Sequence, residues 1–146
     1  MVGSRKRFAL ADTAQQLVGG FLLAGPFVVT EEVWRLAENM SVFHGLITVC
    51  IVFAIGYGAL YKADHDRNPD READVAGIPT RFISLMIVSF GSVVLLAIVF
   101  AAPETFYGDG LIDGVASRQV VVNTLKAISV GAIFSVVGAA TADSVF

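Results

Sequence analysis

The sequence predicts an all-α protein that crosses a membrane several times. Hydrophobic residues make up 55% of its 146 residues and charged residues only 16%, whereas a soluble domain is about one quarter charged. The mean hydropathy is +0.73. Four apolar segments are each close to the roughly 20 residues that a helix needs to cross a bilayer. Because backbone groups in lipid must bond to one another, these segments are expected to be helices.

The four segments are expected to form one transmembrane domain over residues 1–146. They cover residues 14–33, 42–61, 82–102 and 120–142. In the first segment, Pro26 lacks a backbone donor and clashes with the preceding turn, so a kink is expected near residues 24–26. This segment is also too long for a cleavable signal peptide, and no A-x-A-like cleavage site precedes the glutamates that follow it.

The basic residues predict the orientation. With the N-terminus inside, seven Lys and Arg residues flank the inner ends of the segments and two flank the outer ends: Arg5, Lys6, Arg7, Lys62, Arg67, Arg71 and Arg81 against Arg35 and Arg118. Because basic residues accumulate on the cytoplasmic side, both termini are expected inside, with the protein in the plasma membrane. The outer loops are acidic, which either solvates the surface or concentrates cations there. Acidic loops of this kind are similar to those of salt-loving archaea.

Two adjacent glutamates, Glu31 and Glu32, end the first segment. In a helix that continues to Leu36, Glu31 lies four residues before Arg35 and can pair with it. Glu32 lies about 100° further round the helix and has no such partner. One interpretation places both carboxylates at the membrane interface beside Trp34. The other points Glu32 into the bundle, where ionisable groups are costly and usually functional.

Two basic side chains are candidate partners for Glu32. His44 lies near the outer start of the second segment, and Lys126 lies roughly two turns into the fourth. A Glu32–Lys126 pair would be either part of an ion or proton site or a charge-neutral lock between helices. The sequence leaves both alternatives open.

The fourth segment has a small residue at every fourth position. The series is Ala127, Gly131, Ser135 and Ala139, and it leads to Asp143. Small residues at this spacing let another helix approach closely, so helix packing is predicted here, either within one chain or between subunits. The alternative is a narrow polar path along Asn123, Ser135 and Asp143.

Other classes of site and function receive little support. Alternating carboxylates between the second and third segments suggest a calcium loop, but Pro69 and Val75 occupy the positions that require glycine and glutamate. No phosphate loop, H-E-x-x-H motif or nucleophile–base pair is visible, so neither an enzyme nor a metal or cofactor is expected. The net charge of −3 argues against a nucleic-acid-binding protein, which would be basic.

Two stretches of the sequence carry a resemblance to a known family. Residues 18–34, VGGFLLAGPFVVTEEVW, and residues 130–146, VGAIFSVVGAATADSVF, resemble a family of small archaeal and bacterial four-helix integral membrane proteins of unknown function. Its members have a glycine-rich first helix that runs into a short stretch with a glutamate and a tryptophan. The matching residues here are Gly19, Gly20, Gly25, Pro26, Glu32 and Trp34. The resemblance spans most of the chain and implies no particular activity.

Two functional hypotheses follow, and both place a homo-oligomer in the lipid bilayer. A four-helix chain of this size has little interior, so a conduit would form between subunits. The first hypothesis is a cation channel or small transporter that uses the outer carboxylate of Glu32, with Glu31, His44, Lys126 and Asp143 as further ionisable residues. The second is a non-transporting structural or accessory subunit. In that case Gly131, Ser135, Ala139 and Pro26, together with the polar groups, only fix how the helices pack.

Overall fold

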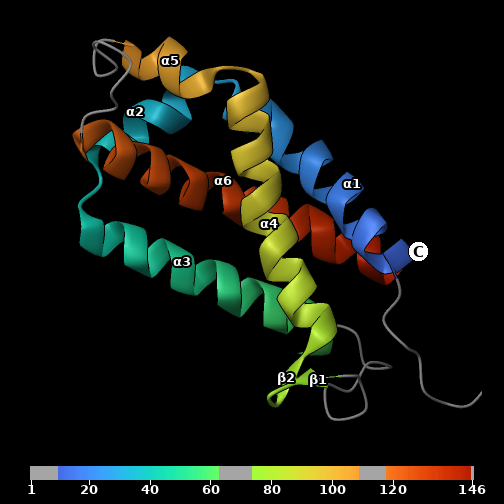
Figure 1. Ribbon diagram of the computed structural model, residues 1–146. Coiled ribbons are helices and arrows are strands. Elements are labelled where there is room, and N and C mark those ends of the chain that lie inside the picture. The colour runs from blue at the N-terminus through green and yellow to red at the C-terminus, as the bar shows by residue number, and fades with distance from the viewer. Residues whose placement is uncertain (1–9, 63–73, 109–117, 146) are drawn as a thin grey trace, which may run out of the picture.

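The computed structural model describes residues 10–62, 74–108 and 118–145 (Figure 1). The elements in these ranges are α1 (Leu10–Val28), α2 (Glu31–Asn39), α3 (Val42–Tyr57), η1 (Gly58–Lys62), β1 (Asp74–Val75), β2 (Ile78–Pro79), α4 (Thr80–Val99), α5 (Ala102–Tyr107) and α6 (Arg118–Val145). The two short strands form an antiparallel hairpin that leads into α4. The predicted all-α class is therefore confirmed.

Three helical stretches are long and apolar enough to cross a membrane. They are Val42–Lys62, Thr80–Val99 and Arg118–Ser144, and they lie close to the second, third and fourth predicted segments. The first predicted segment differs. Helices α1 and α2 are long and apolar enough for a fourth span only when taken together, and the chain bends by 79° between them. The expected kink at residues 24–26 is instead a complete break after Val28.

The hydrogen bonds at the end of α1 explain where the chain turns. Pro26 lies inside α1 and is tolerated there. The Phe27 carbonyl accepts hydrogen bonds from the Thr30 backbone N–H at 3.1 Å and the Thr30 hydroxyl at 2.8 Å. The Val28 carbonyl accepts one from Trp34 Nε1 at 2.8 Å. Because these donors satisfy carbonyls that a continuing helix would have used, α1 can stop and α2 can start in a new direction.

Helix α2 is amphipathic and lies across the end of the bundle. Its buried side chains are Val33, Trp34 and Ala37, whereas both glutamates and Arg35 are exposed. The Trp34 ring contacts Phe106 and Tyr107 of α5, with ring centroids 5.7 and 5.4 Å apart. Figure 1 shows α2 and α5 at the same end of the molecule. This arrangement is typical of short helices that lie in a membrane interface.

Helix α6 is the central element, with α1 and α4 packed against it and α3 along its other side (Figure 1). Helices α1 and α6 run antiparallel and touch at Gly19 and Gly138, where a Cβ on Gly19 would lie 2.2 Å from the Gly138 carbonyl oxygen. Gly131 packs against the side chains of Val93 and Val28. The small residues of α6, including Ser135 and Ala139, are buried within one chain, whereas Pro26 is exposed.

Candidate functional site

A group of polar side chains lies where the start of α1, the start of α4 and the end of α6 meet. We call it the Arg81 cluster, and it consists of Asp12, Thr13, Gln16, Arg81, Ser84 and Asp143. Figure 1 shows the start of α1 beside the C-terminal end of α6. The cluster therefore lies at the end of the bundle opposite α2 and α5.

The centre of the cluster is a buried ion pair. Arg81 Nη1 donates to Asp143 Oδ1 at 2.6 Å, and the two side chains are only 5% and 0% exposed. Arg81 Nη2 donates to Asp12 Oδ2 at 3.4 Å. The Asp12 side chain is 24% exposed. One guanidinium thus joins a fully buried carboxylate to a carboxylate that reaches the surface.

Gln16 connects this ion pair to neutral hydroxyl groups. Its Nε2 donates to Asp143 Oδ2 at 3.3 Å and to the Arg81 backbone carbonyl at 3.5 Å. Its Oε1 accepts from the Ser84 hydroxyl at 2.7 Å, and Ser84 lies 3.0 Å from the Thr13 hydroxyl. Gln16 is completely buried, so each of these bonds replaces one that water would have made. The result is a hydrogen-bonded network that ties three helices together.

The dipoles of the adjacent helices, rather than those of their own helices, stabilise the charges of Arg81 and Asp143. Arg81 is the second residue of α4 and Asp143 lies in the last turn of α6. Each charge is therefore at the unfavourable end of its own helix dipole. Because α6 runs antiparallel to α1 and α4, Asp143 lies beside the N-termini of those helices and Arg81 beside the C-terminus of α6. The dipoles of the adjacent helices thus favour both charges.

A second polar contact continues the cluster along the same interface. The Ser92 and Ser135 hydroxyls lie 2.8 Å apart and are buried. Gly20 faces them, and a Cβ there would lie 2.8 Å from Ser135 Oγ and 3.0 Å from Ser92 Oγ. Beyond this level the interface is mostly apolar and includes Ala24, Val28, Val93, Ala97 and Ala127. Polar groups therefore line one part of the α1–α4–α6 interface, and apolar side chains fill the other part.

The structure does not bring the predicted outer carboxylate into the bundle. Glu32 is exposed, because the break before α2 turns it away from the helix interface. Glu31 accepts a hydrogen bond from Arg35 Nε, and both side chains are exposed. This bond and the charge of Glu31 raise the pKa of Arg35. Within one chain, the interfacial interpretation fits both glutamates, and the inward orientation of Glu32 is wrong.

His44 and Lys126 also have other partners than Glu32. The Ser41 backbone N–H donates to His44 Nδ1 at 3.2 Å, and the His44 backbone N–H donates to the Ser41 hydroxyl at 3.2 Å. This reciprocal pair is a capping box that starts α3. Lys126 is buried and donates through Nζ to the Met40 carbonyl. The proposed Glu32–Lys126 pair is therefore absent from the described part of the chain.

Of the five ionisable residues that the sequence singled out, only Asp143 belongs to the buried network. The suggested polar path from Asn123 to Ser135 is not continuous, because Asn123 accepts from Gln119 within α6 and apolar residues lie between. In the sequence, Arg81 stands out only as one of the basic residues that predict the orientation. Its position directly before an apolar 18-residue stretch, together with a glutamine inside the first helix, was the signal that could have identified the network.

The stability of the folded protein at high pH is expected to depend on Tyr107 of α5. Its hydroxyl donates to the Trp34 carbonyl. Burial, and to a smaller extent the charge of Glu38, raise the pKa of Tyr107 to about 12. Because the unfolded chain has a tyrosine pKa of about 10, the folded state holds this proton more tightly. The resulting stabilisation is complete below about pH 10 and is lost as the pH rises from about 10 to about 12.

An ultraviolet absorbance titration of tyrosinate in the purified protein tests this expectation. Replacement of Tyr107 by phenylalanine should remove a titration step with a midpoint near pH 12. Tyr57→Phe is the control, because the step near pH 12 should survive in that variant. A step near pH 12 that remains in Tyr107→Phe would contradict the role assigned to this hydroxyl.

Comparison with known families gives one match that covers nearly the whole chain. Residues 3–142 match the family model described as "Putative integral membrane protein (DUF2391)". Comparison with curated proteins gives no match, and neither does comparison with solved structures. In the described residues, no group of three His, Cys, Asp or Glu side chains is arranged to hold a metal ion.

Proposed function

The chain belongs to this family of integral membrane proteins, and on that premise we propose that it is a small cation channel or transporter whose binding group is Asp143. The observation that carries the proposal is the buried Arg81–Asp143 pair at the junction of three helices. Ionisable groups inside a membrane protein are costly and usually functional. A buried carboxylate can accept a proton or bind a monovalent cation, and carboxylates line many proton and ion paths in membranes.

The arrangement around Asp143 supports a stepwise path from one side of the membrane. A cation or proton reaches the partly exposed Asp12 first and then competes with Arg81 for Asp143. The oxygens of Gln16, Ser84, Ser92 and Ser135 can then replace water around a small cation. The apolar part of the interface must open for release on the other side. With the predicted orientation, both termini and the Arg81 cluster face the cytoplasm of a cell with this protein in its plasma membrane.

This path lies within one chain and does not need the homo-oligomer expected from the sequence. The Glu32 carboxylate is also not required, because it is exposed on α2. The proposal is therefore a transport function without an enzymatic step and without a cofactor.

A second candidate is a non-transporting structural or accessory subunit. The contact between the Gly19 and Gly138 backbones favours it, because helices that touch so closely leave no space for a solute. In that case the Arg81 cluster is a lock that fixes the register of α1, α4 and α6.

Flux measurements separate the two candidates. We would reconstitute the purified full-length chain into liposomes and measure potassium, sodium, proton and chloride flux separately, with empty liposomes as the control. The transport proposal predicts flux of a cation but not of chloride. If folded protein supports no cation flux under any gradient, the proposal fails and the accessory role is favoured.

A further inference from the structure

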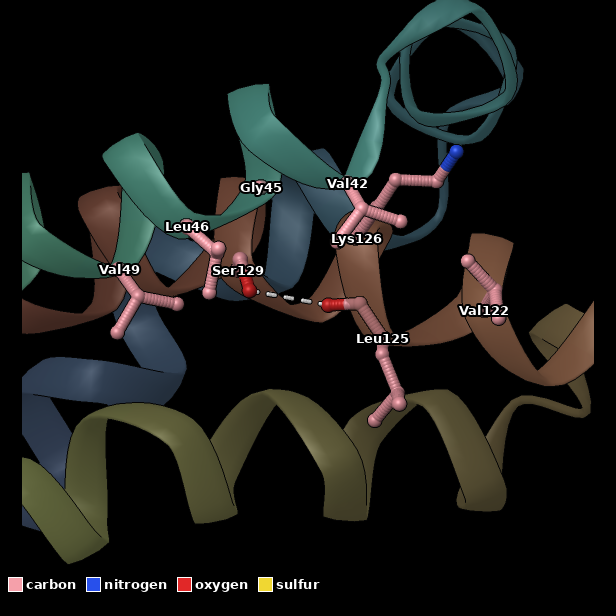
Figure 2. Close-up of a pocket in the computed structure, with 8 residues that line it drawn as sticks. All are labelled: Val42, Gly45, Leu46, Val49, Val122, Leu125, Lys126 and Ser129. Carbon is pink, nitrogen blue, oxygen red and sulfur yellow. Dashed lines mark hydrogen bonds between the residues drawn. The ribbon is translucent and has the colours of Figure 1, made fainter.

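A groove lies on the surface of the chain between α3 and α6. Its volume is about 270 Å³, and its walls include Val42, Leu46 and Val49 of α3 and Val122 and Leu125 of α6 (Figure 2). All five side chains are apolar. The α3 side chains around it, including Val42 and Leu46, are mostly exposed in the single chain. A groove of this character suits one hydrocarbon chain.

A buried cation lies at one end of this groove. The stem of Lys126 packs against Gly45, where a Cβ would lie 3.3 Å from Lys126 Cγ. Figure 2 shows the side chain extending toward the segment that leads into α3. Its ammonium donates to the Met40 carbonyl. The Lys126 residue is only 7% exposed, yet no carboxylate in the described residues pairs with it.

This combination is unusual, because a buried charge is normally paired. An ammonium group has three donors, and the Met40 carbonyl uses one of them. The His44 N–H at the start of α3 already donates to the Ser41 hydroxyl, so this helix end contributes mainly through its dipole. That dipole favours a negative charge at the same place.

We propose that the α3–α6 groove binds an anionic phospholipid. One acyl chain lies along the apolar groove, and the phosphate accepts hydrogen bonds from the Lys126 ammonium near the start of α3. The long stem of Lys126 lets its charge reach the headgroup level from a position inside α6. The lipid phosphate thus supplies the counter-charge that the protein does not provide.

Native mass spectrometry of the full-length protein in detergent tests this site. The probes are phosphatidylglycerol and phosphatidylcholine with identical acyl chains, and glycerol phosphate as a headgroup without chains. Wild-type protein should retain one phosphatidylglycerol in preference to phosphatidylcholine. Lys126→Met should reduce that preference about tenfold, the effect expected for loss of a charge-assisted hydrogen bond. Lys126→Arg should restore it.

Two further variants keep the test decisive. Arg35→Met removes an exposed cation at the same end of the molecule and should leave the preference unchanged. Leu46→Trp fills the groove from an exposed position and should weaken binding of both phospholipids while leaving the folded helical content intact. The proposal is overturned if Lys126→Met retains the wild-type preference, or if glycerol phosphate displaces the lipid as well as a second phospholipid does.

Discussion

Replacement of Arg81 by methionine is expected to lower the free energy of unfolding by about 3–5 kcal/mol, the range for removing one partner of a buried ion pair. The change leaves Asp143, whose side chain is fully buried, without the guanidinium that it contacts at 2.6 Å. It also removes the side-chain hydrogen bond from Arg81 of α4 to the Asp12 carboxylate of α1. Unfolding by denaturant can be followed by the fluorescence of Trp34, the single tryptophan, which is buried.

A double variant distinguishes loss of the ion pair from loss of packing. Arg81→Gln with Asp143→Asn replaces the two charges by amides that can bond to each other and to Gln16. Because a buried pair is not by itself strongly stabilising, this variant should recover most of the stability that either single neutral change loses. If Arg81→Met unfolds at the wild-type denaturant concentration, the cluster does not hold the three helices together.

Replacement of Gly138 by alanine is expected to destabilise the protein by about 3 kcal/mol, at the upper end of the usual cost of overpacking. A Cβ at Gly138 would lie 2.2 Å from the Gly19 carbonyl oxygen and 2.9 Å from Leu23 Cγ. The first of these contacts is with backbone, so no side-chain rotation can relieve it. Helices α1 and α6 must move apart, which also disturbs the Arg81 cluster at their ends.

Two glycines that face open space provide the matched controls. A Cβ at Gly25 or at Gly91 would meet nothing within 4 Å. Alanine at either position should leave stability unchanged or raise it by about 0.5–1 kcal/mol, because alanine favours the helix over glycine. Equal destabilisation in all three variants would show that the Gly19–Gly138 contact has no special role. Unfolding curves in one detergent provide the comparison.

Much of the fold was accessible from the sequence because lipid imposes simple rules. Apolar length alone located the helices that became α3, α4 and α6, each within a few residues of its ends. The spacing of small residues in α6 pointed to close packing, and Gly131 and Ser135 are buried against α1 and α4. These features depend on local pattern, which a single sequence displays.

The break between α1 and α2 depends on contacts that the local pattern does not contain. Pro26 suggested a bend, but the chain turns only after Val28, where the Trp34 indole satisfies a free carbonyl. A helix extrapolated through this point gives Glu32 the wrong direction. Of the two interpretations that the sequence left open for Glu32, the inward one depends on this extrapolation, and the exposed position of Glu32 fits the interfacial one.

The Arg81 cluster could be predicted only in part for a similar reason. Asp143 was identified as ionisable at the end of a small-residue stripe, but its partner Arg81 is 62 residues away in the chain, and Gln16 is 127 residues away. Such pairs become visible only when the antiparallel arrangement of α1 and α6 is known. Arg81, at the start of a helix, was counted as a charge of the membrane interface.

The most direct test of the proposed role of Asp143 is cation flux through the Arg81→Gln, Asp143→Asn double variant in liposomes. This variant is expected to fold, because the amides keep hydrogen bonds with one another and with Gln16, but it has no carboxylate at the binding position. Its cation flux is expected to fall to that of empty liposomes, while Glu32→Gln retains wild-type flux. Wild-type flux in the double variant, or its loss in Glu32→Gln alone, would contradict the assignment of transport to Asp143.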